Sequence, residues 1–149
     1  MADDKTPPWQ SRDSFVSPSR QSERDRLDKI SQVILDSSIE IHRKMGPGLL
    51  ESVYQQALAI ELRERGLFVE WETKVEATWR GQSLGTAFRA DLIVERCVLI
   101  ELKAVADVTT LNRAQVRTYL KLLDFRLGLL INFNSLRLIN GYERIYNRY

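Results

Sequence analysis

The spacing of hydrophobic residues predicts two helices in the first part of the chain. From Arg26 to Met45, apolar residues recur at steps of three, four and seven, as they do on one face of a helix. Gly46-Pro47-Gly48 would end this helix, because glycine and proline rarely continue one. A second apolar stripe begins at Leu50, and Gly66 ends it. The folded part therefore opens with two consecutive helices.

The spacing then changes to two, which predicts strands. From Leu67 to Trp79, apolar and charged residues alternate, as in a strand that buries one face. Gly81 and Gly85 bracket a predicted turn. The next two strands, Phe88 to Val94 and Val98 to Val105, contain continuous apolar runs. Such runs are typical of central strands that are covered on both faces.

The last third of the chain predicts one more helix and two strands. Thr109 or Thr110 can cap a third helix that reaches about Leu123. Leu127 to Phe133 predicts a buried strand. Leu136 to Tyr146 predicts an edge-like strand interrupted by Asn140-Gly141. The order helix, helix, three strands, helix, two strands predicts an α/β (α+β) domain, in which helices flank a mixed sheet.

The N-terminal segment shows no apolar periodicity. Pro7-Pro8, Pro18 and scattered serines predict disorder to about Ser22, so residues 1–24 are assigned to a tail and residues 25–149 to one domain.

Composition is that of an ordinary globular protein, with 44% hydrophobic and 28% charged residues. No apolar run approaches the roughly 18 residues of a membrane span. We therefore expect a cytoplasmic protein without a membrane partner.

The charge and the cysteine count exclude some sites and leave nucleic acid open. Cys97 is the only cysteine and His42 the only histidine, so the chain predicts neither an internal disulfide nor a structural zinc site. The net charge of +2 is too small to indicate a nucleic-acid partner. It does not exclude one, because local charge matters more than the sum.

Three charged residues adjoin the apolar runs of these strands: Asp91, Glu101 and Lys103. Glu101 and Lys103 are two residues apart in a strand, so their side chains share a face. They can form a mutual ion pair or face solvent. Asp91, in the preceding strand, brings a second carboxylate to the same region. Two carboxylates and a lysine can hold a hard cation beside a phosphate.

The loop between these two strands decides whether the carboxylates meet. A two-residue turn at Glu95-Arg96 would pair Asp91 with Ile100 and direct its side chain away from Glu101. A three-residue loop that includes Cys97 would place Asp91 opposite Glu101. A functional site requires the odd loop or an equivalent bulge.

Several polar residues on the helices and on a later strand allow a structural or a functional interpretation. Glu51 and Tyr54 share a face at the start of the second helix, where an acid also complements the helix dipole. His42 is either a structural residue or an additional metal ligand. Asn132, within a buried strand, must find hydrogen bonds and can support the fold or the site.

The third helix carries polar residues within its predicted apolar stripe. Gln115 and Tyr119 are four residues apart, so they point toward the sheet together. Arg113 and Arg117 fall on the opposite side, which we interpret as solvated surface. The other members of the predicted stripe are Leu111, Thr118 and Leu122.

Several segments in order resemble one protein family. Residues 48–54, Gly-Leu-Leu-Glu-Ser-Val-Tyr, resemble the motif that names the GxxExxY family, whose members are assigned to the PD-(D/E)XK nuclease superfamily. Ala90 stands where the superfamily's name has proline, a residue that shapes the backbone and supplies no ligand. The resemblance continues through residues 89–94, 100–104, 114–121 and 128–133.

The resemblance implies a restriction-endonuclease-like core and a metal centre. Asp91 and Glu101, with the backbone carbonyl of Leu102, would hold Mg²⁺ or Mn²⁺, and Glu51 would add an acid from the first core helix. Lys103 would position or activate the attacking water and balance phosphate charge.

Other residues would support this centre. Gln115 and Tyr119 resemble the QxxxY motif of exonuclease-like branches, which supports the site and the scissile strand. Tyr54 is expected to support the site or bind substrate.

Two functions follow from these observations. The first is a divalent-metal-dependent nuclease that hydrolyses phosphodiester bonds of nucleic acid, with DNA favoured over RNA as the substrate. The second is a non-catalytic module of the same fold that binds nucleic acid or protein. The chain shows no strongly basic stripe, so a nuclease of this size would need a protein partner, a homo-oligomer or an unusual substrate for specificity.

Overall fold

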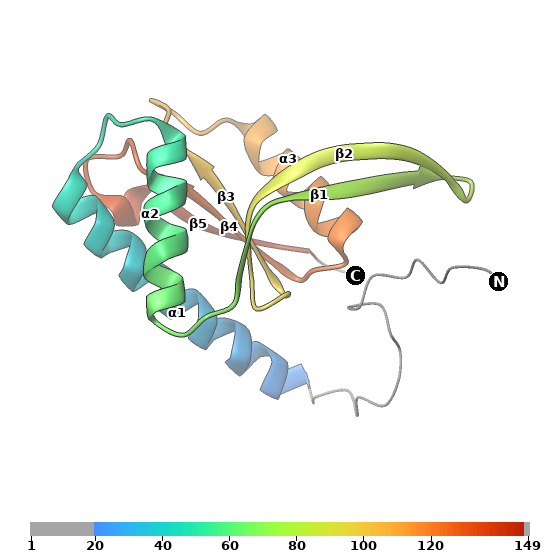
Figure 1. Cartoon of the computed structure of the whole chain (residues 1–149), viewed down its shortest axis with the longest axis horizontal. Coiled ribbons are helices and arrows are strands. Elements are labelled where there is room, and N and C mark those ends of the chain that lie inside the picture. Colours follow the sequence, from blue (N-terminus) through green and yellow to red (C-terminus); the bar gives the residue numbers. More distant parts are fainter. Residues whose placement is uncertain (1–19, 148–149) are drawn as a thin grey trace.

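The computed structural model describes residues 20–147, and these form two helical layers around a five-stranded sheet (Figure 1). Three α-helices, one short 3-10 helix and the strands follow the predicted order. Their bounds are α1 Arg20–Met45, α2 Glu51–Glu64, β1 Val69–Trp79, β2 Gln82–Val94, β3 Val98–Lys103, α3 Thr110–Leu123, β4 Leu127–Asn132, η2 Leu138–Gly141 and β5 Tyr142–Tyr146.

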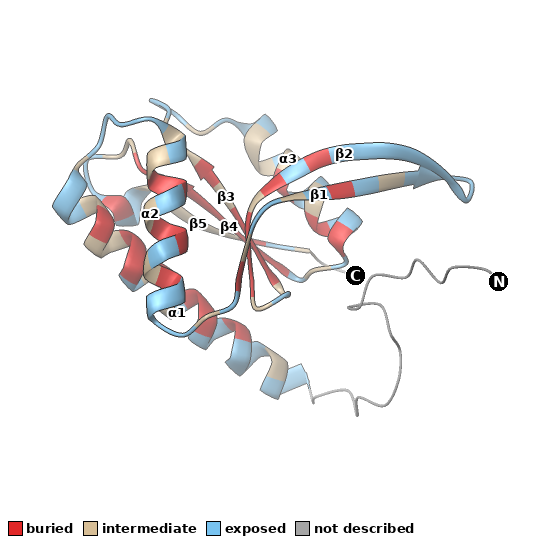
Figure 2. Ribbon diagram, in the orientation of Figure 1, coloured by how far each residue is buried: buried red, intermediate tan, exposed pale blue. Residues whose placement is uncertain are grey.

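The sheet is mixed, as predicted. Its strands lie in the order β1-β2-β3-β4-β5, and only β3 and β4 are parallel. α3 connects these two strands, because parallel neighbours need a crossover. The apolar runs of β3 and β4 are buried on both faces, at the centre of the fold (Figure 2).

Each face of the sheet has its own hydrophobic core. α1 and α2 cover one face, where Ile34 and Leu58 pack with Leu129. α3 covers the other face, where Val116 packs with Leu99. Alternate residues of β3 therefore point to opposite layers, and those of odd number face α3.

α1 begins earlier than the apolar pattern predicts. Arg20 to Ser22, which were assigned to a disordered segment, are helical, and residues 1–19 lie outside the described part. These first turns are exposed and polar, so they leave no periodic signal. A tertiary contact supports them, since Arg126 forms an ion pair with Glu23 at 3.3 Å.

The turn between β1 and β2 is shorter than predicted. Arg80 and Gly81 form a two-residue turn with φ of 49° and 76°, and Trp79 pairs with Gln82. Two positive φ values are typical of the tight hairpin turn that matches strand twist. Gly85 lies inside β2, so the prediction that it bounds the turn was wrong.

The β1–β2 hairpin also extends beyond the rest of the sheet (Figure 1). The alternating pattern assigned Trp71 and Trp79 to the buried face, but both are exposed. The outer part of the hairpin has no helix over it (Figure 2). A two-residue pattern identifies a strand without showing whether anything covers its apolar face.

The predicted strand from Leu136 to Tyr146 is only partly a strand. Its first half forms η2, and β5 begins at Tyr142. Gly141 explains the break, because a Cβ at this position would lie 2.3 Å from the backbone oxygen of Asn132. The chain passes too closely over β4 there for a regular edge strand.

Candidate active site

The candidate site lies where β2 separates from β3. The paired residues of these strands end at Leu92 and Ile100, a register that requires a three-residue loop. Beyond this pair, the backbone N–H of Leu102 donates to Oδ2 of Asp91 at 2.8 Å. The register that brings Asp91 beside Glu101 is therefore confirmed. A side chain replaces the β2 backbone as the partner of β3 at this point.

Gln55 holds the same point from the other side. This buried side chain of α2 donates from Nε2 to the backbone oxygen of Asp91 at 3.0 Å. Asp91 is thus held through its backbone by α2 and through its carboxylate by β3. Sequence reasoning missed Gln55, although a signal was present, since the residue lies four positions after Glu51 on the stripe with Leu58.

Glu101 and Lys103 lie on the α3 side of β3 and are largely buried. Their side chains are 14% and 21% exposed, and Lys103 Nζ lies 3.7 Å from Glu101 Oε1. This distance is an ion pair but too long for a hydrogen bond. Among the described residues, the buried Oε2 atom of Glu101 has no hydrogen-bond partner. A buried carboxylate oxygen without a donor is costly, so it indicates a site made for a further group.

Burial raises the pKa of each acid of the site, and neighbouring carboxylates add to the rise. Burial raises the pKa of Glu101 to about 8, and the charge of Asp91 adds to the rise while Lys103 opposes it. Burial also raises the pKa of Asp91, against the hydrogen bond from Leu102. At the start of α2, the pKa of Glu51 is raised by burial and then by the charge of Asp91. The charge of Asp91 on β2 therefore acts on Glu51 of α2 and on Glu101 of β3.

The carboxylates do not form a preassembled ion site. In the part of the chain that the structure describes, no three His, Cys, Asp or Glu side chains converge closely enough to hold a metal ion. Three carboxylates repel one another when no cation lies between them. The chemistry of the set still fits a hard cation, because Glu101 presents an unpartnered buried oxygen beside Asp91.

Tyr119 flanks this cluster from α3. Its ring stacks on Phe88 of β2, with centroids 3.8 Å apart and planes 7° apart. Burial raises the pKa of Tyr119, and the charge of Glu101 adds to it. Gln115 lies one turn earlier and is half-buried. The two residues of the predicted pair therefore share the face of α3 toward the sheet.

A comparison with protein-family models decides the family. The model of the PD-(D/E)XK nuclease superfamily matches residues 28–145. The chain belongs to this superfamily. No curated protein and no solved structure gives a significant match. The superfamily supports nuclease activity and a nucleic-acid substrate, and its nucleases generally use divalent metal ions. The GxxExxY assignment stays a resemblance carried by residues 48–54.

The match includes Asp91, Glu101 and Lys103, and their assignment to the acids and the lysine of the superfamily's name, with Ala90 in place of proline, stays a prediction. The three-residue loop between β2 and β3 brings the two acids opposite each other, although they are ten positions apart along the chain. The assignment of metal ligands among these residues stays a prediction. The role of the Leu102 carbonyl as a ligand also stays a prediction.

Tyr54 and His42 serve the fold around the superfamily site. Tyr54 is fully buried, and its hydroxyl donates to the Gly46 oxygen at 2.6 Å and accepts from Leu49 N–H at 3.0 Å. It therefore fixes the loop that leads to Glu51 from a fully buried position. His42 Nε2 lies 2.7 Å from the backbone oxygen of Ser135, a contact that favours the structural interpretation.

Asn132 secures the end of β3. Its Nδ2 donates to the Val105 oxygen at 2.8 Å, and its Oδ1 accepts from the N–H groups of Val105 and Asn134. These bonds fix the chain just after Lys103, so the residue supports both the fold and the site.

The apolar stripe of α3 differs from the prediction. Val116, Leu120 and Leu123 are its buried residues, whereas the predicted members Leu111, Thr118 and Leu122 are exposed. The predicted stripe was too broad, because α3 crosses the sheet on a narrow face centred on Val116 and Leu120.

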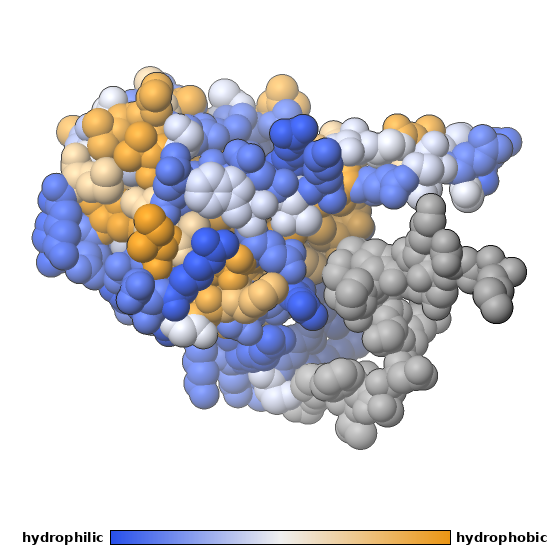
Figure 3. Space-filling model, viewed as in Figure 1, coloured by the Kyte–Doolittle hydropathy of each residue, from blue (hydrophilic) through white to orange (hydrophobic). Residues whose placement is uncertain are grey.

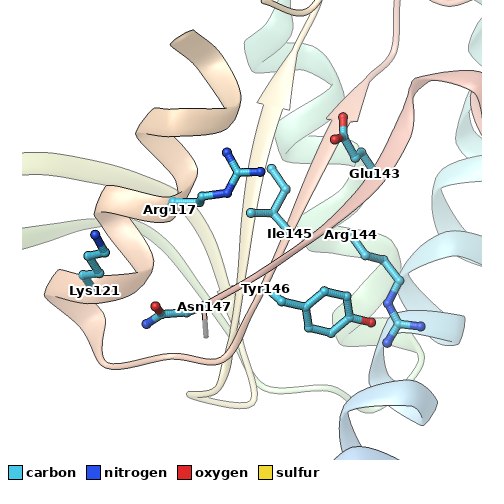
Figure 4. Close-up of a pocket in the computed structure, with 7 residues that line it drawn as sticks. All are labelled: Arg117, Lys121, Glu143, Arg144, Ile145, Tyr146 and Asn147. Carbon is cyan, nitrogen blue, oxygen red and sulfur yellow. The ribbon is translucent and has the colours of Figure 1, made fainter. Parts of the chain in front are cut away.

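The far side of α3 forms a groove along the edge strand β5 (Figure 4). Arg117 and Lys121 line it from α3, and its volume is about 420 Å³. Arg113, interpreted as solvated, instead binds both carboxylate oxygens of Glu143 at 2.8 and 3.0 Å. None of the predicted site residues lines this groove, so it is separate from the carboxylate cluster.

Within residues 20–147, no helix has the length and apolarity that crossing a membrane requires.

Proposed function

We propose that the chain is a divalent-metal-dependent nuclease that hydrolyses phosphodiester bonds in nucleic acid, with DNA preferred to RNA. The observation that carries this proposal is the buried, unpartnered Oε2 atom of Glu101 beside Asp91 and Lys103. Membership of the nuclease superfamily supports the same reaction.

Four groups would hold Mg²⁺ or Mn²⁺ in this proposal: the carboxylates of Asp91, Glu101 and Glu51 and the backbone carbonyl of Leu102. Oxygen ligands of this kind suit hard cations. When bound, such a cation lowers the pKa of water and offsets charge on the phosphate. Asp91 is already oriented for this role, since one of its oxygens is fixed by Leu102 N–H and its backbone by Gln55.

Lys103 is proposed as the residue that acts on the attacking water and the phosphate. Its amine lies 3.7 Å from Glu101 Oε1 and its side chain is 21% exposed, so it is near the acids and still accessible to a substrate. A fixed positive charge there would stabilise the negative charge that grows on the phosphate. Tyr119 and Gln115 would support the scissile strand from α3.

The test is a cleavage time course with Mn²⁺ on labelled single- and double-stranded DNA and RNA, beside calorimetric metal titrations. Lys103→Ala should keep metal binding and slow hydrolysis by a factor on the order of a hundred or more, because it removes a charge used mainly in the transition state. Glu101→Ala should lose both metal binding and activity. Arg117→Ala, in the groove behind α3, is the matched control and should change neither. Equal rates for wild type and Lys103→Ala would contradict the proposed mechanism.

The alternative is a non-catalytic module of the same fold that binds nucleic acid or protein. One observation favours it, since the described acids are not drawn together as a ready metal site. Metal binding without cleavage of any of the four substrates would support this alternative.

A further inference from the structure

The outer part of the β1–β2 hairpin stands apart from the folded body. We call residues 74–89 the arm. In the space-filling view it projects from the body, with a hydrophilic tip and a small apolar patch (Figure 3). No helix packs against its outer half (Figure 1). A strand pair that leaves the core needs another reason for its length, because two strands alone are only marginally stable.

The arm is firmly attached at its base, beside the candidate site. Val75 and Phe88 pair across the hairpin and are buried against α3. The Phe88 ring stacks on Tyr119, which itself lies within the electrostatic reach of Glu101. Asp91 follows two residues after the arm on the same strand. The arm therefore has a defined direction relative to the carboxylates.

The side chains of the arm combine exposed cations with exposed aromatic and aliphatic groups. Its cations are Lys74, Arg80 and Arg89, all exposed, and its single acid is Glu76, which accepts a hydrogen bond from the Ser83 hydroxyl. Trp79 and Leu84, near the tip, are 68% and 66% exposed. An exposed ring among cations is typical of surfaces that bind single-stranded nucleic acid, where bases stack and phosphates pair with positive charge.

We propose that the arm binds a single-stranded segment of the nucleic-acid substrate, with a base stacked on Trp79 and phosphates beside Arg80, Lys74 and Arg89. This inference rests on the proposed nuclease function and adds to it a substrate class. The interior of a duplex offers no free base face, so the stacking contact within a strand requires unpaired nucleotides.

The distance between Trp79 and Asp91 limits which nucleotide Trp79 can contact. Trp79 pairs with Gln82, and nine residues separate Gln82 from Asp91 along β2. At about 3.3 Å per residue the separation is at most about 30 Å. With about 3.4 Å per nucleotide in a stacked strand, Trp79 would contact a nucleotide up to roughly nine positions from the scissile phosphate. Very short substrates would not reach it.

A protein partner fits the arm less well. The exposed apolar side chains near the tip are those of Trp79 and Leu84, whereas a stable interface buries about 800 Å² on each partner. The cations would also repel the same arm of a second copy. A polyanion matches both the charge and the narrow shape.

The experiment measures binding of fluorescently labelled oligonucleotides by anisotropy in EDTA, where metal-dependent cleavage does not occur. Trp79→Ala should weaken binding of a 20-nucleotide single strand about 10-fold or more, the size of one lost stacking contact. Trp79→Phe should restore most of the affinity, since it keeps an aromatic face. Trp71→Ala is the matched control, a tryptophan of the same hairpin outside the arm, and should change binding little. A duplex of the same length should lose much less affinity on Trp79→Ala than the single strand does, because only its two terminal base pairs expose a base face.

Two results would overturn the inference. One is equal affinity of wild type and Trp79→Ala for the long single strand. The other is a change of molar mass in light scattering when Trp79 is replaced, which would assign the surface to a protein partner. The experiment distinguishes failure of the two proposals. Binding that depends on Trp79 without any cleavage contradicts only the nuclease proposal. Cleavage together with binding that does not depend on Trp79 contradicts only the role of the arm.

Discussion

Replacement of Glu101 by glutamine should change how the stability of the metal-free protein depends on pH. The wild-type carboxyl is buried beside Asp91, and its pKa is raised from 4.5 to about 8. An acid with a raised pKa in the folded state stabilises the fold below its unfolded pKa, and this contribution is lost as pH rises toward the folded value. The window for Glu101 is therefore pH 4.5 to 8.

The size of the effect follows from the same values. One pKa unit corresponds to about 1.4 kcal/mol, so a rise of about three units costs on the order of 3 to 5 kcal/mol of unfolding free energy across this window. Such a loss is a large share of the stability of a small domain. Glu101→Gln removes the titrating group and keeps the shape, so its advantage over wild type should grow by about this amount between pH 5 and pH 8.

The assay is urea unfolding in EDTA at several pH values, followed by circular dichroism. Glu64→Gln, which removes an exposed acid from α2, is the control and should follow the wild-type profile. Added Mn²⁺ should stabilise wild type more at pH 8 than at pH 5, because the cation favours the ionised form, and should not stabilise Glu101→Gln to the same extent. Parallel pH profiles for wild type and Glu101→Gln would refute the reasoning, since burial and repulsion would then not act on this carboxyl.

Other substitutions test the two residues that fix the junction of β2 and β3. Asp91→Asn should leave the metal-free protein about as stable as wild type, because it removes charge repulsion while the amide oxygen can still accept from Leu102 N–H. It should abolish the stabilisation by Mn²⁺ that thermal unfolding measures. An unfolded variant, or one that keeps its Mn²⁺ response, would show that Asp91 is structural. Gln55→Leu should cost about 1 to 3 kcal/mol in urea unfolding, since the partly buried backbone oxygen of Asp91 loses its donor, and calorimetry should show weaker Mn²⁺ binding. Unchanged metal affinity would mean that Gln55 serves the fold alone.

The sequence predicted the parts of the fold that repeat along the chain. Apolar runs identified the central strands, and the odd loop at residues 95–97 followed from requiring the two acids to meet. The pattern failed where a structure depends on contacts distant in sequence. The first turns of α1 form an ion pair with Arg126, and the break before β5 coincides with the close approach of Gly141 to Asn132.

The candidate site shows the same division. Asp91, Glu101 and Lys103 were visible because charges stand out in apolar strands. Gln55 was missed, because a glutamine on a helix is ordinary until the strand beside it is known. The exposure of Trp79 was also missed, since alternation alone does not show where the covering helices end.

The junction of β2 and β3 explains how the fold tolerates buried acids that lower its stability. The unfavourable charges are confined to the place where the two strands separate, while the strand segments on the core side, with residues such as Leu92 and Ile100, are fully buried and apolar. The core therefore supplies the stability that the acids remove, as expected when strain is concentrated at a functional site. The same separation frees the outer hairpin from the sheet. The separation of β2 from β3 at Asp91 therefore has two consequences. It brings the acids together, and it lets the arm extend away from them.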